Sequence, residues 1–190
     1  MIVSRRGRAP TAGRIVETEA YLGPADEASH AAMRPGSHVL LYGEGGHAYV
    51  YLNYGMHWCL NAITNPTGKP GCVLIRALEP LEGVATMARR RGVPAASRRL
   101  ASGPGNLTRA LGLSLRDNGA DLTRGALVIL SPDQPRGFRV ARGPRVGITR
   151  SMDLPLRFWI AGNPFVSRLS GSGASGRGRG RRAQGPSVRR

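Results

Sequence analysis

The chain is poor in cysteine, lysine and long apolar runs, and each shortage excludes a class of protein. Its two cysteines, Cys59 and Cys72, are too few for a disulfide framework and too far apart for a metal knuckle, so we expect both to be reduced core residues. Lys69 is the only lysine. No apolar run approaches the roughly 20 residues that cross a bilayer, and the start lacks the apolar segment of a secretory signal. These absences predict a soluble cytoplasmic protein without membrane contacts.

Acidic residues are scarce as well. There are 11 of them against 28 lysines and arginines, which gives a formal net charge of +17 and a pI of about 11.6. A polyanion is therefore the default partner, with nucleic acid as the first candidate, although a genomic bias toward arginine is an alternative source of part of the charge. Seven arginines lie in residues 168–190, a Gly- and Ser-rich stretch that we expect to be a disordered tail after a folded domain of residues 1–167. The other 21 basic residues still outnumber the acidic ones, so we expect the folded domain itself to be basic.

The length of 190 residues suits one domain with a single core. Runs rich in β-branched and aromatic residues predict strands at residues 14–22, 48–54, 58–64, 72–78, 126–130, 145–149 and 156–160. A helix is predicted over 80–91, with a proline near its start, a glutamate in its first turn and arginines at its end. A second helix is predicted over 102–112, with Ser102 as its cap and a closing glycine. The expected fold is a mixed α/β (α+β) domain with a curved, largely antiparallel sheet and flanking helices.

One predicted strand, Arg14-Ile-Val-Glu-Thr-Glu-Ala-Tyr21, carries a row of acidic side chains. At the two-residue strand period the side chains on the acidic face are Ile15, Glu17, Glu19 and Tyr21, while those expected to face the core are Val16, Thr18, Ala20 and Leu22. Carboxylates beside an aromatic ring in a basic protein suggest chemistry on a nucleic acid base. The pattern alone equally allows two ion pairs with arginines.

The tyrosines are clustered, because all five fall between Tyr21 and Tyr54. Tyr49 and Tyr51 share one face of a predicted strand, and Tyr54 precedes a glycine that permits a tight turn. We therefore expect Tyr54 at an exposed hairpin tip. There it either packs the turn or wedges between stacked bases and fills the gap left by an extruded base.

Several segments together resemble the alkyladenine (3-methyladenine) DNA glycosylase family. They are Gly13-Arg-Ile-Val-Glu-Thr-Glu-Ala-Tyr-Leu-Gly-Pro-Ala-Asp-Glu-Ala-Ser-His30, Tyr49-Val-Tyr-Leu-Asn-Tyr-Gly-Met-His-Trp-Cys-Leu-Asn61, Cys72-Val-Leu-Ile-Arg-Ala-Leu-Glu-Pro-Leu-Glu-Gly83, Ser102-Gly-Pro-Gly-Asn-Leu-Thr108, Pro144-Arg-Val-Gly-Ile148 and Leu156-Arg-Phe-Trp-Ile-Ala-Gly-Asn-Pro-Phe-Val-Ser167. The resemblance implies a monofunctional DNA glycosylase that flips a damaged purine from double-stranded DNA and hydrolyses its bond to deoxyribose. It implies no metal or cofactor, and we expect a monomer associated with the nucleoid. Family members usually carry a further helix and strand before the segment that begins at Arg14, where this chain has thirteen residues.

The resemblance also assigns two catalytic residues. Glu19 matches the family's base, which orients and deprotonates a water and faces the positive charge of an oxocarbenium-like transition state. Arg76 is placed beside that water. It lies in the apolar run Cys72 to Leu78, where its charge needs a carboxylate, a phosphate or ordered water. Glu17 is then expected to be structural, in an ion pair with an arginine.

Six further residues match positions that contact DNA. Tyr21, His30 and Tyr51 match the rings that stack on the flipped base, where electron-rich faces favour a positively charged purine such as 3-methyladenine or 7-methylguanine. Asn61 matches the position that obstructs the exocyclic amine of a normal purine. Tyr54 matches the side chain that enters the minor groove, with Met56 on the same hairpin.

Structural roles remain open for these positions, namely strand packing for Tyr21 and Tyr51 and local hydrogen bonding for His30 and Asn61. At the level of the whole protein, the alternatives are a catalytically inactive or non-enzymatic DNA-binding homologue and a bifunctional glycosylase. Lyase activity needs an amine nucleophile, for which Lys69 is the sole side-chain candidate.

Overall fold

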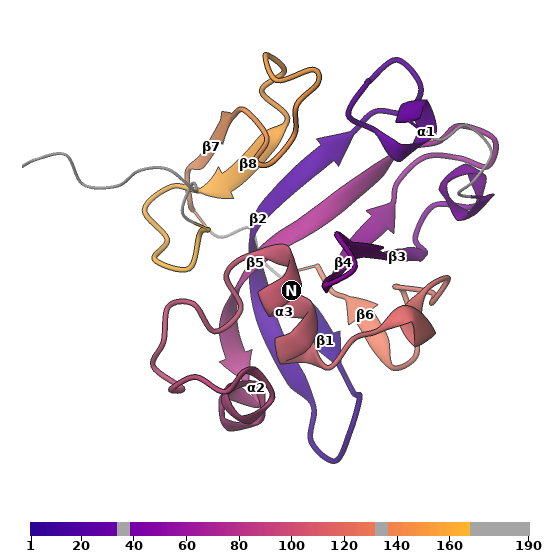
Figure 1. Cartoon of the computed structure of the whole chain (residues 1–190). Coiled ribbons are helices and arrows are strands. Elements are labelled where there is room, and N and C mark those ends of the chain that lie inside the picture. Colours follow the sequence, from indigo (N-terminus) through magenta and orange to yellow (C-terminus); the bar gives the residue numbers. More distant parts are fainter. Residues whose placement is uncertain (34–38, 132–136, 168–190) are drawn as a thin grey trace, which may run out of the picture.

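The computed structural model describes residues 1–33, 39–131 and 137–167, which form an antiparallel sheet with helices beside it (Figure 1). The strands are β1 (Ile2–Ser4), β2 (Thr11–Tyr21), β3 (Ala48–Asn53), β4 (His57–Ile63), β5 (Cys72–Glu82), β6 (Leu127–Ile129), β7 (Val140–Gly143) and β8 (Arg157–Ile160). The helices are α1 (His30–Met33), α2 (Val84–Arg91) and α3 (Pro104–Leu111), with 3-10 turns at Val39–Tyr42 and Leu115–Asp117. The predicted tail of residues 168–190 lies outside the described residues.

Strand β2 organises the sheet, whose order is β3-β4-β5-β2-β1-β6. It pairs with β5 along its whole length, with β1 near its beginning and with β8 near its end, and β8 in turn pairs with β7. Three register shifts interrupt the pairing of β2 with β5. Because bulges bend a strand and increase its twist, the sheet curls, as Figure 1 shows around β2 and β5. The predicted mixed fold with a curved antiparallel sheet is confirmed.

The main core lies between the sheet and helices α2 and α3. Buried side chains on the inner sheet face and on the helices make up this core, among them Ile2, Val50, Leu60, Ile75, Leu78, Met87, Leu107 and Leu111. Helix α3 packs on β4 and β5, and the Thr108 hydroxyl donates a hydrogen bond of 2.9 Å to the Trp58 carbonyl. Helix α3 therefore fixes the position of the strand that carries Cys59 and Asn61.

The strand predictions hold for β2 to β6 and for β8, but not elsewhere. Residues 145–149 were predicted to form a strand and instead form a loop, in which the Arg145 side chain and the Val146 N–H bind carboxylates of the site described below. Strands β1 and β7 were not predicted, since runs of three and four residues are too short to show a period.

The predicted helix over residues 80–91 begins later than expected. Strand β5 continues to Glu82, where residues 80 and 82 pair with the start of β2, and α2 begins after Gly83. Gly83 has φ of +66°, and a Cβ there would lie 2.3 Å from the Pro10 carbonyl oxygen, so only glycine permits this junction. The predicted acidic first turn is therefore wrong, while the arginines of the last turn are confirmed.

Two smaller predictions also fail. Ser102 does not cap α3, since the residue at the cap position is Gly103 and Ser102 pairs with Ala77 instead. Leu22 was expected on the core, yet it is 57 % exposed, because β2 ends at Tyr21 and the chain turns at Gly23. Thr18 and Ala20 were expected there too but are only half-buried, whereas Ile15 packs on the core, because register shifts interrupt the alternation of β2. Within the described ranges, every helix is too short or too polar to cross a membrane. In the same ranges no three His, Cys, Asp or Glu side chains gather as metal ligands would.

Candidate active site

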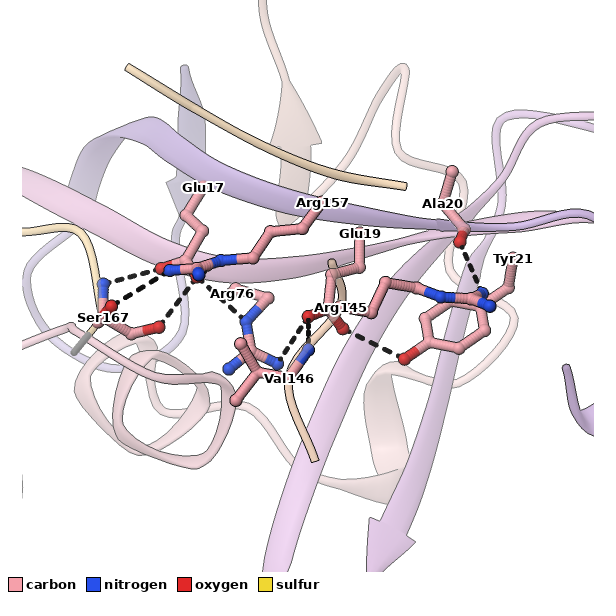
Figure 2. Close-up of polar contacts among 9 residues, drawn as sticks. All are labelled: Glu17, Glu19, Ala20, Tyr21, Arg76, Arg145, Val146, Arg157 and Ser167. Carbon is pink, nitrogen blue, oxygen red and sulfur yellow. Dashed lines mark hydrogen bonds and ion pairs between the residues drawn. The ribbon is translucent and has the colours of Figure 1, made fainter. Parts of the chain in front are cut away.

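Glu19 lies at the centre of a buried polar network (Figure 2). Its Oε1 atom accepts a hydrogen bond of 2.7 Å from the Val146 N–H and lies 3.2 Å from Nη1 of Arg76. Its Oε2 atom accepts a hydrogen bond of 3.0 Å from the Tyr21 hydroxyl. The carboxylate has no exposed surface, so it depends entirely on these three donors for compensation of its charge.

Glu17 is saturated by structural partners, as expected. Its Oε1 atom lies 3.1 Å from Nε of Arg76 and 2.8 Å from Nε of Arg157, and it accepts a third bond from the Ser167 hydroxyl. Its Oε2 atom accepts a bond of 2.7 Å from the Ser167 N–H. Arg76 thus bridges Glu17 and Glu19, which meets the need for a carboxylate partner inferred from its apolar surroundings. Glu17 thus carries four contacts, and of its partners only Arg76 lines the cavity described below, whereas Glu19 carries three contacts and keeps a free acceptor position on Oε2.

A cavity of about 250 Å³ lies directly in front of Glu19. Among its lining residues are Tyr21, His30, Tyr51, Tyr54, Asn61 and Arg76, six of the eight site residues predicted from the sequence. The structure therefore brings together residues from β2, α1, β3, β4 and β5. Glu19 and Met56 do not line the cavity themselves. One layer of residues separates Glu19 from the cavity, because its three polar partners, Tyr21, Arg76 and Val146, all line the cavity.

Aromatic rings form one wall of the cavity. The His30 and Tyr51 rings lie 4.5 Å apart edge-to-face, and the Tyr49 ring stacks on that of Tyr51 at 5.4 Å. The Tyr49 hydroxyl lies 2.7 Å from Nδ1 of His30, which fixes the orientation of the imidazole. Sequence reasoning gave Tyr49 no role, although its position two residues before Tyr51 already placed both rings on one face.

The polar floor of the cavity is formed by Asn61 and two thiols. The Asn61 amide donates a hydrogen bond of 3.0 Å to the Tyr49 carbonyl, and its oxygen faces the Cys72 thiol at 3.8 Å. Burial raises the pKa of Cys59 and raises that of Cys72 to about 12, so both thiols are protonated at neutral pH. The cysteines are free and buried as predicted, and they also line the cavity.

The β3–β4 hairpin carries its most exposed side chains at the tip. Tyr54 is 78 % exposed and Met56 is 70 % exposed, so neither packs the turn. Tyr54 and Gly55 both have positive φ, at 50° and 68°, and Met56 N–H donates to the Asn53 carbonyl to close the turn. A bulky residue with positive φ is unusual, which makes Tyr54 a strained and outward-pointing side chain beside the cavity.

A second buried ion pair lies behind Tyr21. Nη1 and Nη2 of Arg145 lie 2.5 Å and 2.7 Å from the two carboxylate oxygens of Asp26, and both side chains are almost fully buried. Arg145 also covers the Tyr21 ring, with its central carbon 4.7 Å from the ring centroid. Sequence reasoning gave neither partner a role, because no local pattern links Asp26 to an arginine 119 positions away.

Comparison with known proteins identifies the family. The model of the methylpurine-DNA glycosylase family matches residues 1–164. The chain belongs to this family.

Bacterial and archaeal relatives of this glycosylase agree in name. A protein of Koribacter versatilis is 48 % identical over 171 residues, covering 88 % of this chain and 83 % of its own length. One from Methanoculleus marisnigri is 44 % identical over 171 residues, covering 88 % of both chains. A third, from Chlorobaculum tepidum, is 47 % identical over 162 residues, covering 83 % and 76 %. Each is named, provisionally, as a 3-methyladenine DNA glycosylase. The resemblance noted in the sequence is confirmed, and membership makes this chain a DNA glycosylase, a hydrolase of DNA repair.

Proposed function

We propose that this glycosylase excises alkylated purines of the 3-methyladenine and 7-methylguanine class from duplex DNA, using a water activated by Glu19. The observation that carries the proposal is the placement of a buried carboxylate one side-chain layer behind an aromatic cavity. Hydrolysis of a glycosidic bond needs a carboxylate at the sugar and a site that holds the leaving base. The network around Glu19 and the tyrosine wall supply these two parts.

The aromatic wall favours a cationic base. Tyr21, His30 and Tyr51 present ring faces and edges to a cavity that is also lined by protonated thiols and by the amides of Asn53 and Asn61. A positively charged purine gains cation–π attraction from such rings that a neutral purine lacks. Alkylation also makes the purine a better leaving group, so its departure does not require an acid. A charged lesion is therefore the substrate that this set of side chains suits best.

The water step follows from the unused acceptor site of Glu19. Three of about four acceptor positions on the carboxylate are occupied, and the remaining one lies on the oxygen bonded to Tyr21. A water held there and by Arg76 can give its proton to Glu19 while its oxygen attacks C1′ of the deoxyribose. The bond from C1′ to the purine nitrogen breaks, and its electron pair neutralises the charge of the departing base.

Access to Glu19 requires a small movement on substrate binding. Tyr21, Arg76 and Val146 separate the carboxylate from the cavity, and Val146 belongs to a loop, which can move more readily than a strand. A base stacked against Tyr21 presses on this layer. We propose that its arrival shifts residues 147–150 while the Val146 N–H stays bonded to Glu19, and that this shift admits the water to the sugar side of Glu19.

A covalent lyase mechanism fits less well. Lys69 is the only lysine, and it lies exposed in the turn between β4 and β5 and is not among the residues that line the cavity. A monofunctional enzyme is therefore proposed, with no protein amine attached to the sugar.

The direct test is release of 3-methyladenine and 7-methylguanine from alkylated duplex DNA by the full chain under single-turnover conditions. We expect free base and an intact abasic strand, and no adduct after borohydride treatment. A trapped adduct would instead support the lyase mechanism. Binding to damaged duplex without any base release would show that the chain is an inactive homologue.

A further inference from the structure

Three segments that line the cavity meet at one buried ion pair. Asp26 begins the stretch that includes Ala28 and His30, Arg145 begins the loop of residues 146–150, and Arg145 lies over Tyr21. All three segments contribute lining residues, yet neither Asp26 nor Arg145 lines the cavity. The pair therefore lies behind the site and joins its parts.

The contacts of Asp26 hold the end of β2 and the chain that follows. Its carboxylate accepts bonds of 3.2 Å from the N–H groups of Leu22 and Ala28, in addition to the two bonds from Arg145. Burial opposes ionisation of Asp26, but these hydrogen bonds and the positive charge outweigh it, and its pKa lies below the ordinary value. The carboxylate is thus a fixed anion at the base of the cavity wall.

The contacts of Arg145 reach the remaining segments. Its Nη1 atom donates 3.0 Å to the Ala20 carbonyl, and its Nη2 atom lies 3.4 Å from the Ser151 carbonyl at the far end of the loop. Arg145 directly precedes the loop of residues 146–150, and its guanidinium contacts Ser151 directly after the loop. The side chain therefore holds both ends of this loop. Directly after Arg145, the N–H of Val146 points at Glu19 and donates the 2.7 Å bond. In Figure 2 the Arg145 side chain passes over the Tyr21 ring while Val146 reaches Glu19 from the other side.

We infer that Arg145, held by Asp26, is a positioning residue that sets the two donors on Glu19, the Val146 N–H and the Tyr21 hydroxyl. The inference rests on the proposed function, since it concerns the geometry of the same carboxylate. Arg145 neither lines the cavity nor donates a hydrogen bond to Glu19, so beyond the attraction between the two charges it acts on the geometry of Glu19 through Val146 and Tyr21. Its Nε atom is buried and has no hydrogen-bond partner among the residues that the structure describes, so the side chain is not optimised for stability alone.

The test compares Arg145→Lys and Asp26→Asn with a matched control. Lysine keeps the charge of Arg145 but cannot bind Asp26 through two parallel bonds, and asparagine keeps the shape of Asp26. Because a misplacement of about 1 Å can slow chemistry by about 100-fold, we expect a loss of that order in the single-turnover rate for both variants. Affinity for undamaged duplex should stay within about twofold, because the DNA-facing hairpin is unchanged.

The control is Asp117→Asn. Asp117 is also buried, receives a 2.8 Å bond from Arg6 and accepts a backbone N–H bond, but it lies outside the cavity. We expect it to lower the melting temperature while leaving the excision rate of the folded protein unchanged. If Arg145→Lys and Asp26→Asn behave in the same way, the positioning role is wrong.

A second measurement does not depend on activity. Amide hydrogen exchange at Val146 should accelerate at least about tenfold in Arg145→Lys and Asp26→Asn, because these two substitutions release the loop. It should not accelerate in Asp117→Asn. Unchanged exchange at Val146 would overturn the inference even in an active enzyme. If the wild-type protein releases no base, accelerated exchange in the two variants would still support the positioning role while the proposed reaction is refuted, so the two failures are distinguishable.

Discussion

At the scale of single residues, the site depends on how two chemically identical glutamates differ. Glu17 has two arginines and Ser167 around it, whereas Glu19 has one arginine, one phenol and one backbone N–H. Both are buried, so their hydrogen-bond partners rather than their exposure decide their roles. A saturated carboxylate stabilises the fold, and an unsaturated one beside a cavity can accept a proton.

Substitution Glu19→Gln tests this division directly. The amide keeps the size of the side chain but cannot accept a proton from water, so we expect excision to fall by about 100-fold or more. Binding to lesion-containing duplex should persist, as measured by fluorescence anisotropy. Glu79→Gln is the control, because Glu79 is also paired with an arginine, at 3.1 Å from Arg14, but lies outside the cavity. Wild-type single-turnover rates for Glu19→Gln would exclude Glu19 as the base.

Tyr21→Phe separates ring stacking from hydrogen bonding. The variant keeps the ring under Arg145 and loses the hydroxyl that donates to Oε2 of Glu19. A hydrogen bond to a charged group is worth about 1.5–3 kcal/mol, which corresponds to excision roughly 10- to 100-fold slower if the bond matters in the transition state. Tyr42→Phe, outside the cavity, is the control. Equal rates in both variants would limit Tyr21 to stacking.

The pH dependence of the wild-type enzyme follows from the same hydroxyl. Burial and then the charge of Glu19 raise the pKa of Tyr21 above its ordinary value of 10.0. The phenol therefore remains a donor as the pH rises to the range where exposed tyrosines ionise. We expect no loss of single-turnover excision between pH 8 and about pH 10 from this residue. A decline that Tyr21→Phe abolishes would contradict this expectation.

At the scale of elements, the β3–β4 hairpin and the 146–150 loop approach the cavity from different parts of the chain. The hairpin is rigid, with six residue pairs in register and a turn closed by Met56 N–H. The loop has no ladder and depends on Arg145 and Glu19 for its contacts. A regular hairpin and a loop without strand pairing would suit the proposed steps of base flipping and hydrolysis.

Tyr54→Asn tests the hairpin as a wedge. Asparagine accepts the positive φ of this position better than tyrosine does, so the turn should keep its stability while the ring is lost. We expect excision from a paired duplex to fall more than excision of the same lesion opposite a gap, where no flipping is required. Leu115→Ala removes another exposed apolar side chain and serves as the control. Equal losses on both substrates would exclude a wedge.

The ion pair of Asp26 and Arg145 predicts how stability depends on pH. The pKa of Asp26 is lowered from 3.8, so the unfolded chain binds a proton more readily than the folded one. Its contribution is complete above about pH 4 and is lost as the pH falls through the lower folded-state value. Asp26→Asn should cost about 3 kcal/mol at pH 7, because it leaves Arg145 buried without its partner. Urea unfolding from pH 7 to pH 2 should show a flatter profile for the variant.

At the scale of the whole molecule, the sequence predicted the parts whose signals are local. Runs rich in β-branched and aromatic residues located β2 to β5, and the clustering of the tyrosines along the chain corresponds to the aromatic wall of the cavity. The loop of residues 146–150 was misjudged as a strand, because its partner Glu19 lies 127 positions away. The end of β5 was likewise set by pairing with β2 rather than by helix propensity. Contacts between residues far apart in the sequence therefore determine these features, which short sequence patterns do not predict.

The positive net charge is also a property of the whole molecule, and part of it gathers near helices α2 and α3. Arg91 and Arg109 lie in the last turns of α2 and α3, and Arg99 lies in the connection between these helices. Burial and the charges of Arg109 and Arg99 lower the pKa of Arg91. The guanidiniums of Arg91 and Arg109 are held by the Leu100 and Arg90 carbonyls, and none of the three forms an ion pair with a carboxylate in the described parts of the chain. DNA phosphates would relieve this repulsion.

Helix α3 connects this surface to the site, since Pro104 at its first turn lines the cavity and Arg109 lies in its last turn. If a flanking stretch of duplex follows the helix, Arg99→Ala and Arg109→Ala should each reduce the slope of log affinity against log salt by about 0.9. Arg124→Ala is the control, because Arg124 is exposed but already paired with Asp121 at 2.7 Å. Identical slopes for all three variants, measured by anisotropy on undamaged duplex, would mean that the duplex leaves the cavity in another direction.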